Sequence, residues 1–482
     1  MGFAGRDLVS ITDFTNEEIE AVLNLADQMD SALKKGTRLD FCKGQDMATL
    51  FYEPSTRTRG SFERAMHKLG GTVISFAEAQ TMSSAAKGET IADTVRVLKS
   101  YADVIVIRHP WEGAARVAAD YSQVPVINAG DGSHEHPTQT LCDLYTLRKE
   151  KGKLQGLTVL LWGDLKYGRT VHSLIYALAR FGAEVVCAPL PGLDLPQAVL
   201  RRLSLEYDYV PKKAKPSDSR SLIGEVDVFY IAPLHPYNLA LWPDSESPIR
   251  PEIGIKEALR KADAIYVTRV QTERYVSTTP REQAEPAAVV DRRLLNYLHS
   301  KTLVMHPLPR VNELAYDLDD YPASVYFQQA AYGVPIRMAL TALLLGTTSI
   351  DVPQTGDRCR TDDTYLECRQ IIDVKCPNPN CVSNRESHYI KPRLKMISRK
   401  PDEPLILRCA YCEDETHPPY IASSEWHQGM IKNKRYHKSD SFMLNRIRPQ
   451  NLIIFGSDTE AQLHGFMPSR RGTKQQMGDE IP

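Results

Sequence analysis

The stretch that decides the fold is FYEPSTRTRGSFE, which runs from Phe51 to Glu63. Its pattern predicts a strand end, a turn at Pro54 and an amphipathic helix that begins at Ser55. The first turn of a helix presents unpaired backbone N–H groups and the positive end of the helix dipole. Three hydroxyls and two arginines crowd into that turn. They favour a cradle for a phosphate group over an ordinary capped surface helix.

The same stretch resembles the phosphate-binding signature, Ser-Thr-Arg-Thr-Arg, of the aspartate and ornithine carbamoyltransferases. The resemblance extends through most of residues 1–345. It implies that Arg57 and Thr58 take part in catalysis. It also implies that four residues of this turn bind the phosphate of carbamoyl phosphate: Ser55, Thr56, Arg57 and Thr58.

Composition narrows the class of protein. The 482 residues carry 59 basic and 60 acidic side chains, so no overall field favours a nucleic acid or a membrane as partner. No apolar run approaches the length of a membrane-spanning helix, and the first residues lack the apolar core of a signal peptide. We expect a cytoplasmic protein in which any anion site is local.

Alternating helical patterns and short β-rich runs predict α/β domains with parallel sheets. The first set of predicted strands is Met47–Phe51, Thr72–Phe76, Val104–Ile107 and Val124–Asn128. A second set begins with Leu157–Trp162, a helix over Arg169–Phe181 and a strand at Glu184–Ala188, and continues with Ile265–Arg269 and Leu303–His306.

We therefore expect two parallel-sheet α/β domains of the carbamoyltransferase type, followed by a small zinc-bound β-rich domain. The predicted boundaries are a carbamoyl-phosphate-binding domain over 1–150 with a closing helix at 326–347, an aspartate-binding domain over 151–325, a linker over 349–365, a zinc-binding domain over 366–422 and a C-terminal tail over 423–482. The tail is expected to be irregular, with one apolar cluster at Leu452–Phe455 that could dock it. Residues 209–258 resemble an insertion with no assigned role.

The turn from Gly163 to Gly168 is an alternative candidate for a nucleotide site. It has two glycines after a buried strand, but the full Gly-x-Gly-x-x-Gly pattern of a dinucleotide site is missing. We therefore expect no organic cofactor.

Further candidate residues follow predicted strands and loops. Arg108 stands at the carboxyl end of a strand, where ligands bind in open α/β sheets. His136 and Gln139 follow a glycine-containing loop and open a helix. By resemblance, Arg108 contacts the phosphate and the carbonyl oxygen, His136 donates to that oxygen, and Gln139 binds the carbamoyl amine.

The polar tract from Thr81 to Glu89 reads by itself as an exposed loop. By resemblance it lends Ser83 and Lys87 to the active site of a neighbouring subunit. This implies a homo-oligomer with shared sites, a trimer or a multiple of trimers.

The second domain is expected to bind the amino acid. Arg169 opens a helix, and Arg269 and Gln271 follow a strand. An arginine fork pairs bidentately with a carboxylate. By resemblance, these residues and Lys87 bind aspartate.

The motif His306-Pro-Leu-Pro-Arg310 follows another predicted strand. By resemblance, Leu308 and Pro309 supply backbone carbonyls to the reacting amines. Ornithine enzymes carry a cysteine in this motif and an Asp-x-x-x-Ser-Met-Gly motif elsewhere, and this chain has neither. No residue stands out as a general base, so the proton acceptor stays open, with the leaving phosphate as one candidate.

Six of the nine cysteines crowd into the C-terminal part. Four of them form two knuckles whose spacing suits a tetrahedral Zn²⁺ site: Cys376, Cys381, Cys409 and Cys412. Two disulfides are the alternative, which an intracellular protein disfavours. Four thiolates leave no open position, so we expect one structural Zn²⁺ per chain. Residues 366–420 resemble the zinc domain of the aspartate carbamoyltransferase regulatory chain, without the nucleotide-binding domain that precedes it there.

The function expected from this resemblance is transfer of a carbamoyl group from carbamoyl phosphate to L-aspartate, in pyrimidine biosynthesis. Two alternatives remain at this point. One is a carbamoyltransferase for another amino acid such as ornithine, and the other is a catalytically inactive regulatory or binding homologue.

Overall fold

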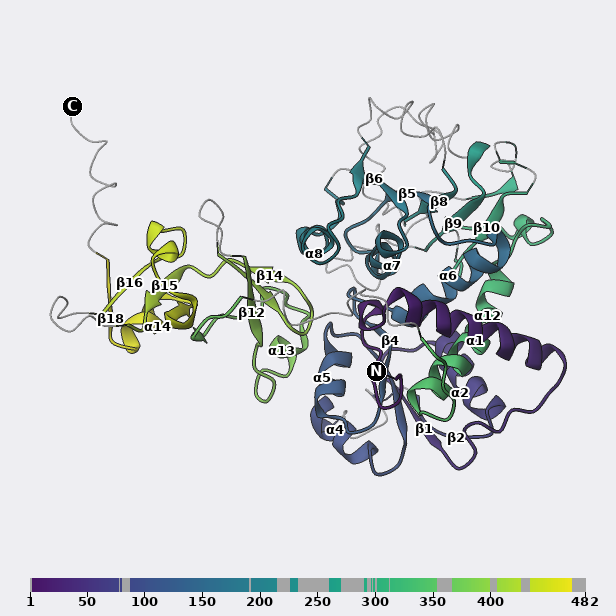
Figure 1. Cartoon of the computed structure of the whole chain (residues 1–482), viewed down its shortest axis with the longest axis horizontal. Helices are drawn as coiled ribbons and strands as arrows, with labels where there is room; N and C mark the ends of the chain where they lie inside the picture. Colours follow the sequence, from purple (N-terminus) through teal and green to yellow (C-terminus); the bar gives the residue numbers. More distant parts are fainter. Residues whose placement is uncertain are drawn as a thin grey trace. The chain divides into compact units, whose positions relative to one another are not determined.

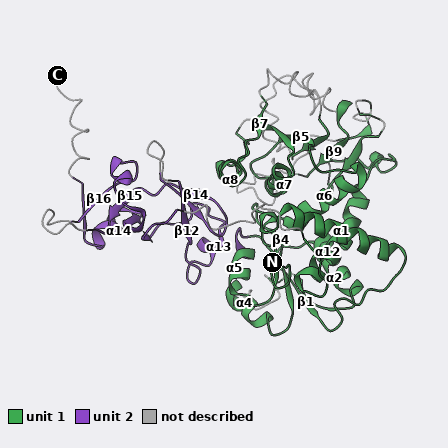
Figure 2. Ribbon diagram, in the orientation of Figure 1, with its two compact units in different colours: residues 1–110, 115–360 green, residues 111–114, 361–482 purple. Residues whose placement is uncertain are grey.

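The computed structural model describes residues 2–77, 79, 87–189, 192–214, 226–232, 260–269, 290–292, 296, 298–299, 301–311, 313–352, 366–398, 405–425 and 434–469. The chain forms two compact units (Figure 2). Unit 1 comprises residues 1–110 and 115–360, and unit 2 comprises residues 111–114 and 361–482.

The first lobe of unit 1 is built on a four-stranded sheet in the order β2-β1-β3-β4 (Figure 1). Its strands all run parallel. They are β1 Asp46–Phe51, β2 Thr72–Phe76, β3 Val104–His109 and β4 Val126–Asp131. Every residue of β3 and β4 is buried, as expected when helices cover both faces of a parallel sheet.

The helices of this lobe are α1 Asn16–Lys34, α2 Thr56–Lys68, α4 Ile91–Leu98, α5 Ala114–Tyr121 and α6 Pro137–Lys151. The long helix α12, Tyr326–Leu344, returns from the far end of unit 1 and packs against α1, α2 and α6 (Figure 1). It brings residues from late in the sequence to the first lobe.

The second lobe is built on a six-stranded sheet in the order β10-β9-β8-β5-β6-β7, again with all strands parallel. Its strands are β5 Thr158–Gly163, β6 Glu184–Pro189, β7 Lys212–Lys213, β8 Val228–Ile231, β9 Ala264–Val267 and β10 Leu303–Met305. Its described helices include α7 Arg169–Arg180 and α8 Gln197–Tyr207. The two parallel sheets confirm the predicted α/β fold class. Most of the predicted insertion at 209–258 lies outside the described residues.

Unit 2 contains two β-sheets. The first is antiparallel and has the strands β12 Leu394–Ser398, β13 Ile406–Cys409 and β14 Glu415–Thr416, with the short helix α13 Val382–Arg385 nearby in the chain. The second has the order β11-β17-β15-β16-β18, with strands β11 Gln370–Ile372, β15 Tyr420–Ser423, β16 Lys434–Lys438, β17 Leu452–Phe455 and β18 Phe466–Pro468 and the helix α14 Asp458–Leu463. Unit 2 is thus β-rich, as expected.

The predicted irregular tail is wrong for residues 434–468, because β16, β17, β18 and α14 all lie there. The apolar cluster Leu452–Phe455 is a strand inside the second sheet, paired on one side with β11 and on the other with β15. Phe455 and Tyr436 pack with Phe466 in a small buried core. These short strands are stabilised by contacts between distant parts of the sequence, which no local pattern reports.

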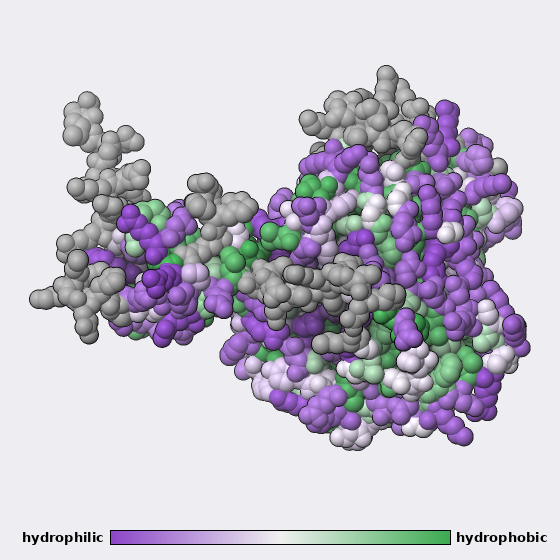
Figure 3. Space-filling view, in the orientation of Figure 1, coloured by the Kyte–Doolittle hydropathy of each residue, from purple (hydrophilic) through white to green (hydrophobic). Residues whose placement is uncertain are grey.

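None of the helices that the structure describes combines the length and the apolar composition needed to cross a lipid bilayer. The face of unit 1 visible in Figure 3 is correspondingly dominated by hydrophilic residues, with apolar ones scattered between them.

Candidate functional site: an arginine-lined cleft and a four-cysteine cluster

A cavity of about 560 Å³ in unit 1 brings together nearly all of the predicted site residues that the structure describes. It is lined from both lobes and from α12. The predicted residues in its wall are Ser55, Thr56, Arg57, Thr58, Arg108, His136, Gln139, Arg169, Arg269, Leu308 and Pro309.

Lys87 is exposed and does not line this cavity in its own chain. Ser83 and Gln271 lie outside the described residues. The part assigned to these three residues by resemblance therefore remains a prediction.

The start of α2 forms one wall of the cleft. Ser55 is the residue before the helix, and its side chain makes no capping hydrogen bond to the first turn. No acidic side chain occupies that turn either, so the positive end of the helix dipole stays uncompensated. Burial and the charges of Arg269 and Arg108 lower the pKa of Arg57. Three guanidinium groups thus repel one another here, an arrangement that an anion would relieve.

Arg108 lies at the carboxyl end of β3 and is only 6 % exposed. Its Nη1 donates to the Ala129 carbonyl at 3.2 Å, and its Nη2 donates to Glu53 Oε1 at 2.5 Å. The same Glu53 oxygen is 4.0 Å from Nη2 of Arg169, which belongs to the second lobe. Glu53 therefore contacts one arginine from each lobe, Arg108 and Arg169, through the same carboxylate oxygen. Sequence reasoning missed it, although it lies two residues after the end of β1, at the carboxyl edge of the sheet where ligands bind.

A glycine makes this convergence possible. Gly130 has a φ of +115°, which L side chains rarely adopt. A Cβ at this position would lie 3.1 Å from Arg108 Nη1, 3.2 Å from Arg169 Nη1 and 3.4 Å from His136 Cδ2. The three side chains therefore gather closely around a bare backbone position.

His136 precedes the first residue of α6 and is 4 % exposed. Its backbone N–H donates to Ser173 Oγ on α7 at 3.0 Å, and Thr138 Oγ1 lies 3.4 Å from its Nδ1. These contacts hold the histidine in the wall of the cleft.

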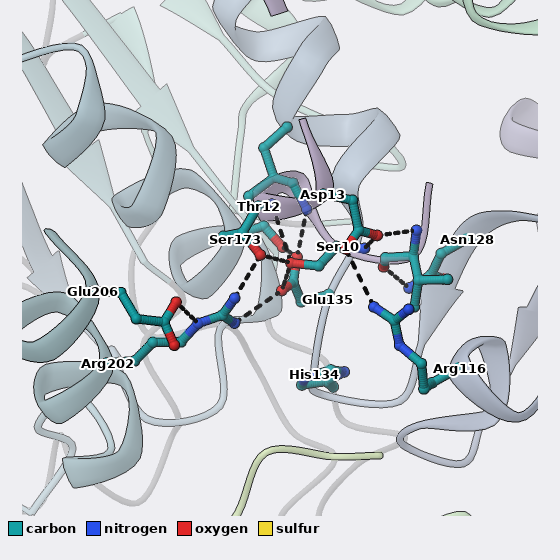
Figure 4. Close-up of polar contacts among 12 residues, drawn as sticks. Ser10, Thr12, Asp13, Arg116, Asn128, His134, Glu135, Ser173, Arg202 and Glu206 are labelled. Carbon is teal, nitrogen blue, oxygen red and sulfur yellow. Dashed lines mark hydrogen bonds and ion pairs between the residues drawn. The ribbon is translucent and has the colours of Figure 1, made fainter. Parts of the chain in front are cut away.

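A buried polar network around Glu135, the residue before His136, joins the lobes (Figure 4). Glu135 and Arg202 are both 1 % exposed, and Arg202 Nη1 lies 3.8 Å from Glu135 Oε1. Glu135 also accepts from Ser10 Oγ at 2.6 Å and from Ser173 Oγ at 3.2 Å. Ser173 thus contacts both Glu135 and the His136 backbone, which ties the loop before α6 to α7.

Arg202 has further partners on both sides (Figure 4). Its Nε donates to Glu206 Oε2 at 2.9 Å, and its Nη2 donates to Thr12 Oγ1 at 2.5 Å. The guanidinium also stacks 4.6 Å from the ring centroid of Tyr176. Because its charge is matched by carboxylates, this arginine connects structural elements and has no need of a ligand.

The segment from His306 to Pro309 forms the opposite side of the cleft. The Leu308 N–H donates to His306 Nδ1 at 2.8 Å, so Nδ1 is an acceptor and Nε2 carries the hydrogen. That Nε2 lies 2.8 Å from Glu313 Oε1. Burial lowers the pKa of His306 despite the adjacent Glu313. Leu308 has a φ of +52°, and the Leu308–Pro309 peptide is cis.

In unit 2 the four predicted cysteines are all buried, and their sulfur atoms lie within 4.8 Å of one another. The Cys376 and Cys412 sulfurs are 3.4 Å apart, and those of Cys381 and Cys409 are 3.8 Å apart. A disulfide needs about 2.05 Å, and the four thiols are free. A tetrahedron with Zn–S bonds of about 2.3 Å has sulfur–sulfur edges of roughly 3.8 Å. The cluster fits a tetrahedral metal ion.

Comparisons with known proteins agree with this geometry. Residues 6–149 match the carbamoyl-phosphate-binding domain of the aspartate/ornithine carbamoyltransferases, and residues 243–344 match their aspartate/ornithine-binding domain. Residues 367–420 match the metal-binding domain of the aspartate carbamoyltransferase regulatory chain.

Curated relatives match about seven tenths of the chain. The aspartate carbamoyltransferase catalytic subunit of Thermoplasma acidophilum is 42% identical over 341 residues, covering 71% of this chain and 98% of the relative. The catalytic subunit of Methanopyrus kandleri is 43% identical over 345 residues, with the same coverage.

Solved structures match the same part. The Trypanosoma cruzi aspartate transcarbamoylase, solved with carbamoyl phosphate and aspartate, is 34% identical with a TM-score of 0.58, covering 71% of this chain and 98% of that one. The catalytic subunit from M. jannaschii is 41% identical with a TM-score of 0.55 and the same coverage. The chain therefore belongs to the aspartate/ornithine carbamoyltransferase family. Within that family it resembles the aspartate enzymes, joined here to a regulatory-chain metal-binding domain, as the sequence predicted.

Proposed function

We propose that the cleft transfers the carbamoyl group of carbamoyl phosphate to the amino group of L-aspartate. The products are N-carbamoyl-L-aspartate and phosphate, an early step in making pyrimidines. The observation that carries the proposal is the charge of the cleft. Among the described lining residues there are five arginines and one carboxylate, Glu53. That excess of positive charge suits a phosphate together with a dicarboxylic amino acid.

The phosphate of carbamoyl phosphate would lie at the start of α2. Ser55 and Thr56 offer hydroxyl groups beside the unpaired N–H groups of the first turn, and Arg57 adds a guanidinium. These groups hold the leaving phosphate in place and stabilise the charge that it gains as the C–O bond breaks.

The carbonyl oxygen of the donor would face Thr58, Arg108 and His136. Negative charge builds on this oxygen when the amine attacks, so donors fixed in advance lower the barrier. Arg108 is fixed by Glu53 and by the Ala129 carbonyl, and His136 is fixed by Ser173. Gln139 and the backbone carbonyls of Leu308 and Pro309 would accept hydrogen bonds from the amines.

The carboxylates of aspartate would bind Arg169 and Arg269, with Gln271 and a neighbouring subunit's Lys87 assisting. Both arginines line the cleft from the second lobe. The exposed position of Lys87 is consistent with a contribution to another chain's site. Ser83 would accompany it, and the assembly would be a trimer or a multiple of trimers.

The proton lost by the attacking amine also needs an acceptor. Glu53 is the one carboxylate among the described lining residues, and it is engaged by Arg108 and Arg169. We therefore assign the proton to the departing phosphate, which is formed beside the amine.

The metal of unit 2 would be one structural Zn²⁺ held by all four cysteines, with no open position for a substrate. The enzyme would work in the cytoplasm, where thiols stay reduced. Metal analysis of freshly purified full-length chain should give one zinc per chain, and a content well below one would contradict the assignment.

The test of the proposed function is an acceptor competition assay. With carbamoyl phosphate as donor, the purified chain should carbamoylate L-aspartate and show little activity with L-ornithine. Because two arginines face the acceptor, the cationic side chain of ornithine would be repelled. Faster transfer to ornithine, or no transfer to either amino acid, would overturn the proposal.

A further inference from the structure

A buried carboxyl group lies directly beneath the cleft. Asp143 is on α6, one turn after Gln139, and is 1 % exposed. Its Oδ1 accepts two hydrogen bonds, from Gln139 Nε2 at 2.8 Å and from Gln329 Nε2 at 3.0 Å. The Tyr266 hydroxyl, on β9, also faces this carboxyl. One carboxyl oxygen therefore holds two amide groups, one from α6 and one from α12.

The first amide faces the cleft. A carboxyl oxygen that accepts must meet the NH₂ end of an amide, so the Asp143 contact fixes which way the Gln139 amide points. Because Nε2 is turned inward, Oε1 is the atom that Gln139 presents to the cleft that it lines. Gln139 is thereby set as a hydrogen-bond acceptor.

The second amide, that of Gln329, binds the backbone on the other side of the cleft. With its Nε2 bonded to Asp143, Gln329 turns its Oε1 toward the His306 backbone N–H, which donates at 2.9 Å. This bond anchors the start of the segment that carries Leu308 and Pro309. The backbone carbonyls of that segment are further acceptors.

We propose that Asp143 is a positioning residue that sets the acceptor pattern of the carbamoyl site through Gln139 and Gln329. The proposal rests on the function proposed above. A carbamoyl group differs from an acetyl group by an NH₂ in place of a CH₃, and only the NH₂ can donate to these acceptors. Asp143 thus determines the preference for carbamoyl phosphate over acetyl phosphate, although it touches neither.

The experiment compares the two phosphates in the full-length chain. The KM for carbamoyl phosphate and the inhibition constant for acetyl phosphate are measured in variants of Asp143. Asp143→Leu keeps the branched shape but removes the acceptor, and it should raise the KM for carbamoyl phosphate about tenfold or more, the effect of losing a buried hydrogen-bonding partner. The acetyl phosphate constant should change less than about twofold, since that ligand never used the acceptors.

Two matched variants separate this role from a general structural one. Asp143→Asn keeps an acceptor oxygen and should behave like the wild type in both constants. Thr140→Val removes a buried hydroxyl on the same helix that has no hydrogen-bond partner within the described chain, and it should also leave the ratio unchanged. If Asp143→Asn is as impaired as Asp143→Leu, or if both phosphates are affected equally, the proposal is wrong.

Should Asp143→Leu fail to fold, Gln329→Met tests the other arm of the arrangement. It leaves the carboxyl in place and should still weaken carbamoyl phosphate selectively, whereas an unchanged ratio would overturn the proposal. A wild-type chain without carbamoyl transfer would instead refute the proposed function, so the two failures are distinguishable.

Discussion

In the network of Figure 4, Arg202 lies between two carboxylates, Glu135 and Glu206, whereas in the cleft Arg57 lies beside two other arginines, Arg108 and Arg269. Both groups are in unit 1, and both are partly or fully withdrawn from water. In the first, the single guanidinium is paired with carboxylates of the protein itself. The second belongs to a cleft whose described lining residues include five arginines and a single carboxylate. The local balance of charge therefore separates arginines that hold the structure from arginines that bind a ligand.

The largest expected effect comes from a cleft arginine. Arg108→Ala should lower kcat by about 10²–10³-fold, as found when one donor to a developing oxyanion is removed. The fold should survive, because the substitution lies at the wall of a cavity. Steady-state assays and thermal melts of the full chain measure both quantities.

Arg38→Ala is the control for this variant, since Arg38 pairs with Asp40 on the surface and its side chain is 79 % exposed. Its kcat should equal that of the wild type. An equal fall in kcat in both variants would show that the effect is not specific to the cleft, and would contradict the role given to Arg108.

Substitutions in the Arg202 network should change the stability of the protein. Arg202→Met leaves the carboxylates of Glu135 and Glu206 without their cation and should cost about 3–5 kcal/mol of unfolding free energy, as for other broken buried pairs. Adding Glu135→Gln removes one of the stranded charges and should recover part of the loss. Denaturant unfolding of the three proteins measures this, and equal stabilities of the single and double variants would contradict the pairing.

A smaller effect should appear in the pH dependence of stability. Burial raises the pKa of Asp143 from 3.8 to about 7. Between these values the folded state binds a proton that the unfolded state has released, so this group costs stability as pH rises through the window. The titratable groups around Asp143 stay uncharged in this pH range, since burial raises the pKa of Tyr230, Tyr266 and Cys142.

Asp143→Asn lacks this titration. Its melting temperature relative to the wild type should therefore rise between pH 5 and pH 8. The pKa of Asp7 is also raised, to about 6, but Asp7 is common to both proteins and cancels in the difference. A difference that stays constant with pH would contradict the raised pKa of Asp143.

How much the sequence could predict depended on whether the signal was local. The residues Ser55–Thr58 of the cleft wall could be singled out because their hydroxyls and arginine are adjacent in the chain, and the four clustered cysteines because their spacing is characteristic of a metal site. Glu53 was missed because its part depends on Arg108 and Arg169, which reach it from two lobes.

Other features lay beyond any local pattern. The pairing of Glu135 with Arg202 joins a loop of the first lobe to α8 of the second, and neither residue stands in a motif. The strand β16 consists mostly of basic residues and β18 has only three residues, so neither shows an alternating apolar pattern, and both are held by pairing within the sheet. Tertiary contacts fix these parts, so only the folded chain reveals them.

The most direct measurement of the central claim is calorimetric titration of inorganic phosphate into the full chain. The wild type should bind one phosphate per chain. Arg57→Ala should weaken that binding at least about tenfold, because a charge-assisted hydrogen bond contributes more than 1.4 kcal/mol. The variant Arg202→Met/Glu135→Gln should bind phosphate as the wild type does. Equal phosphate affinity in the wild type and Arg57→Ala would contradict the claim that the cleft's surplus charge forms the anion site.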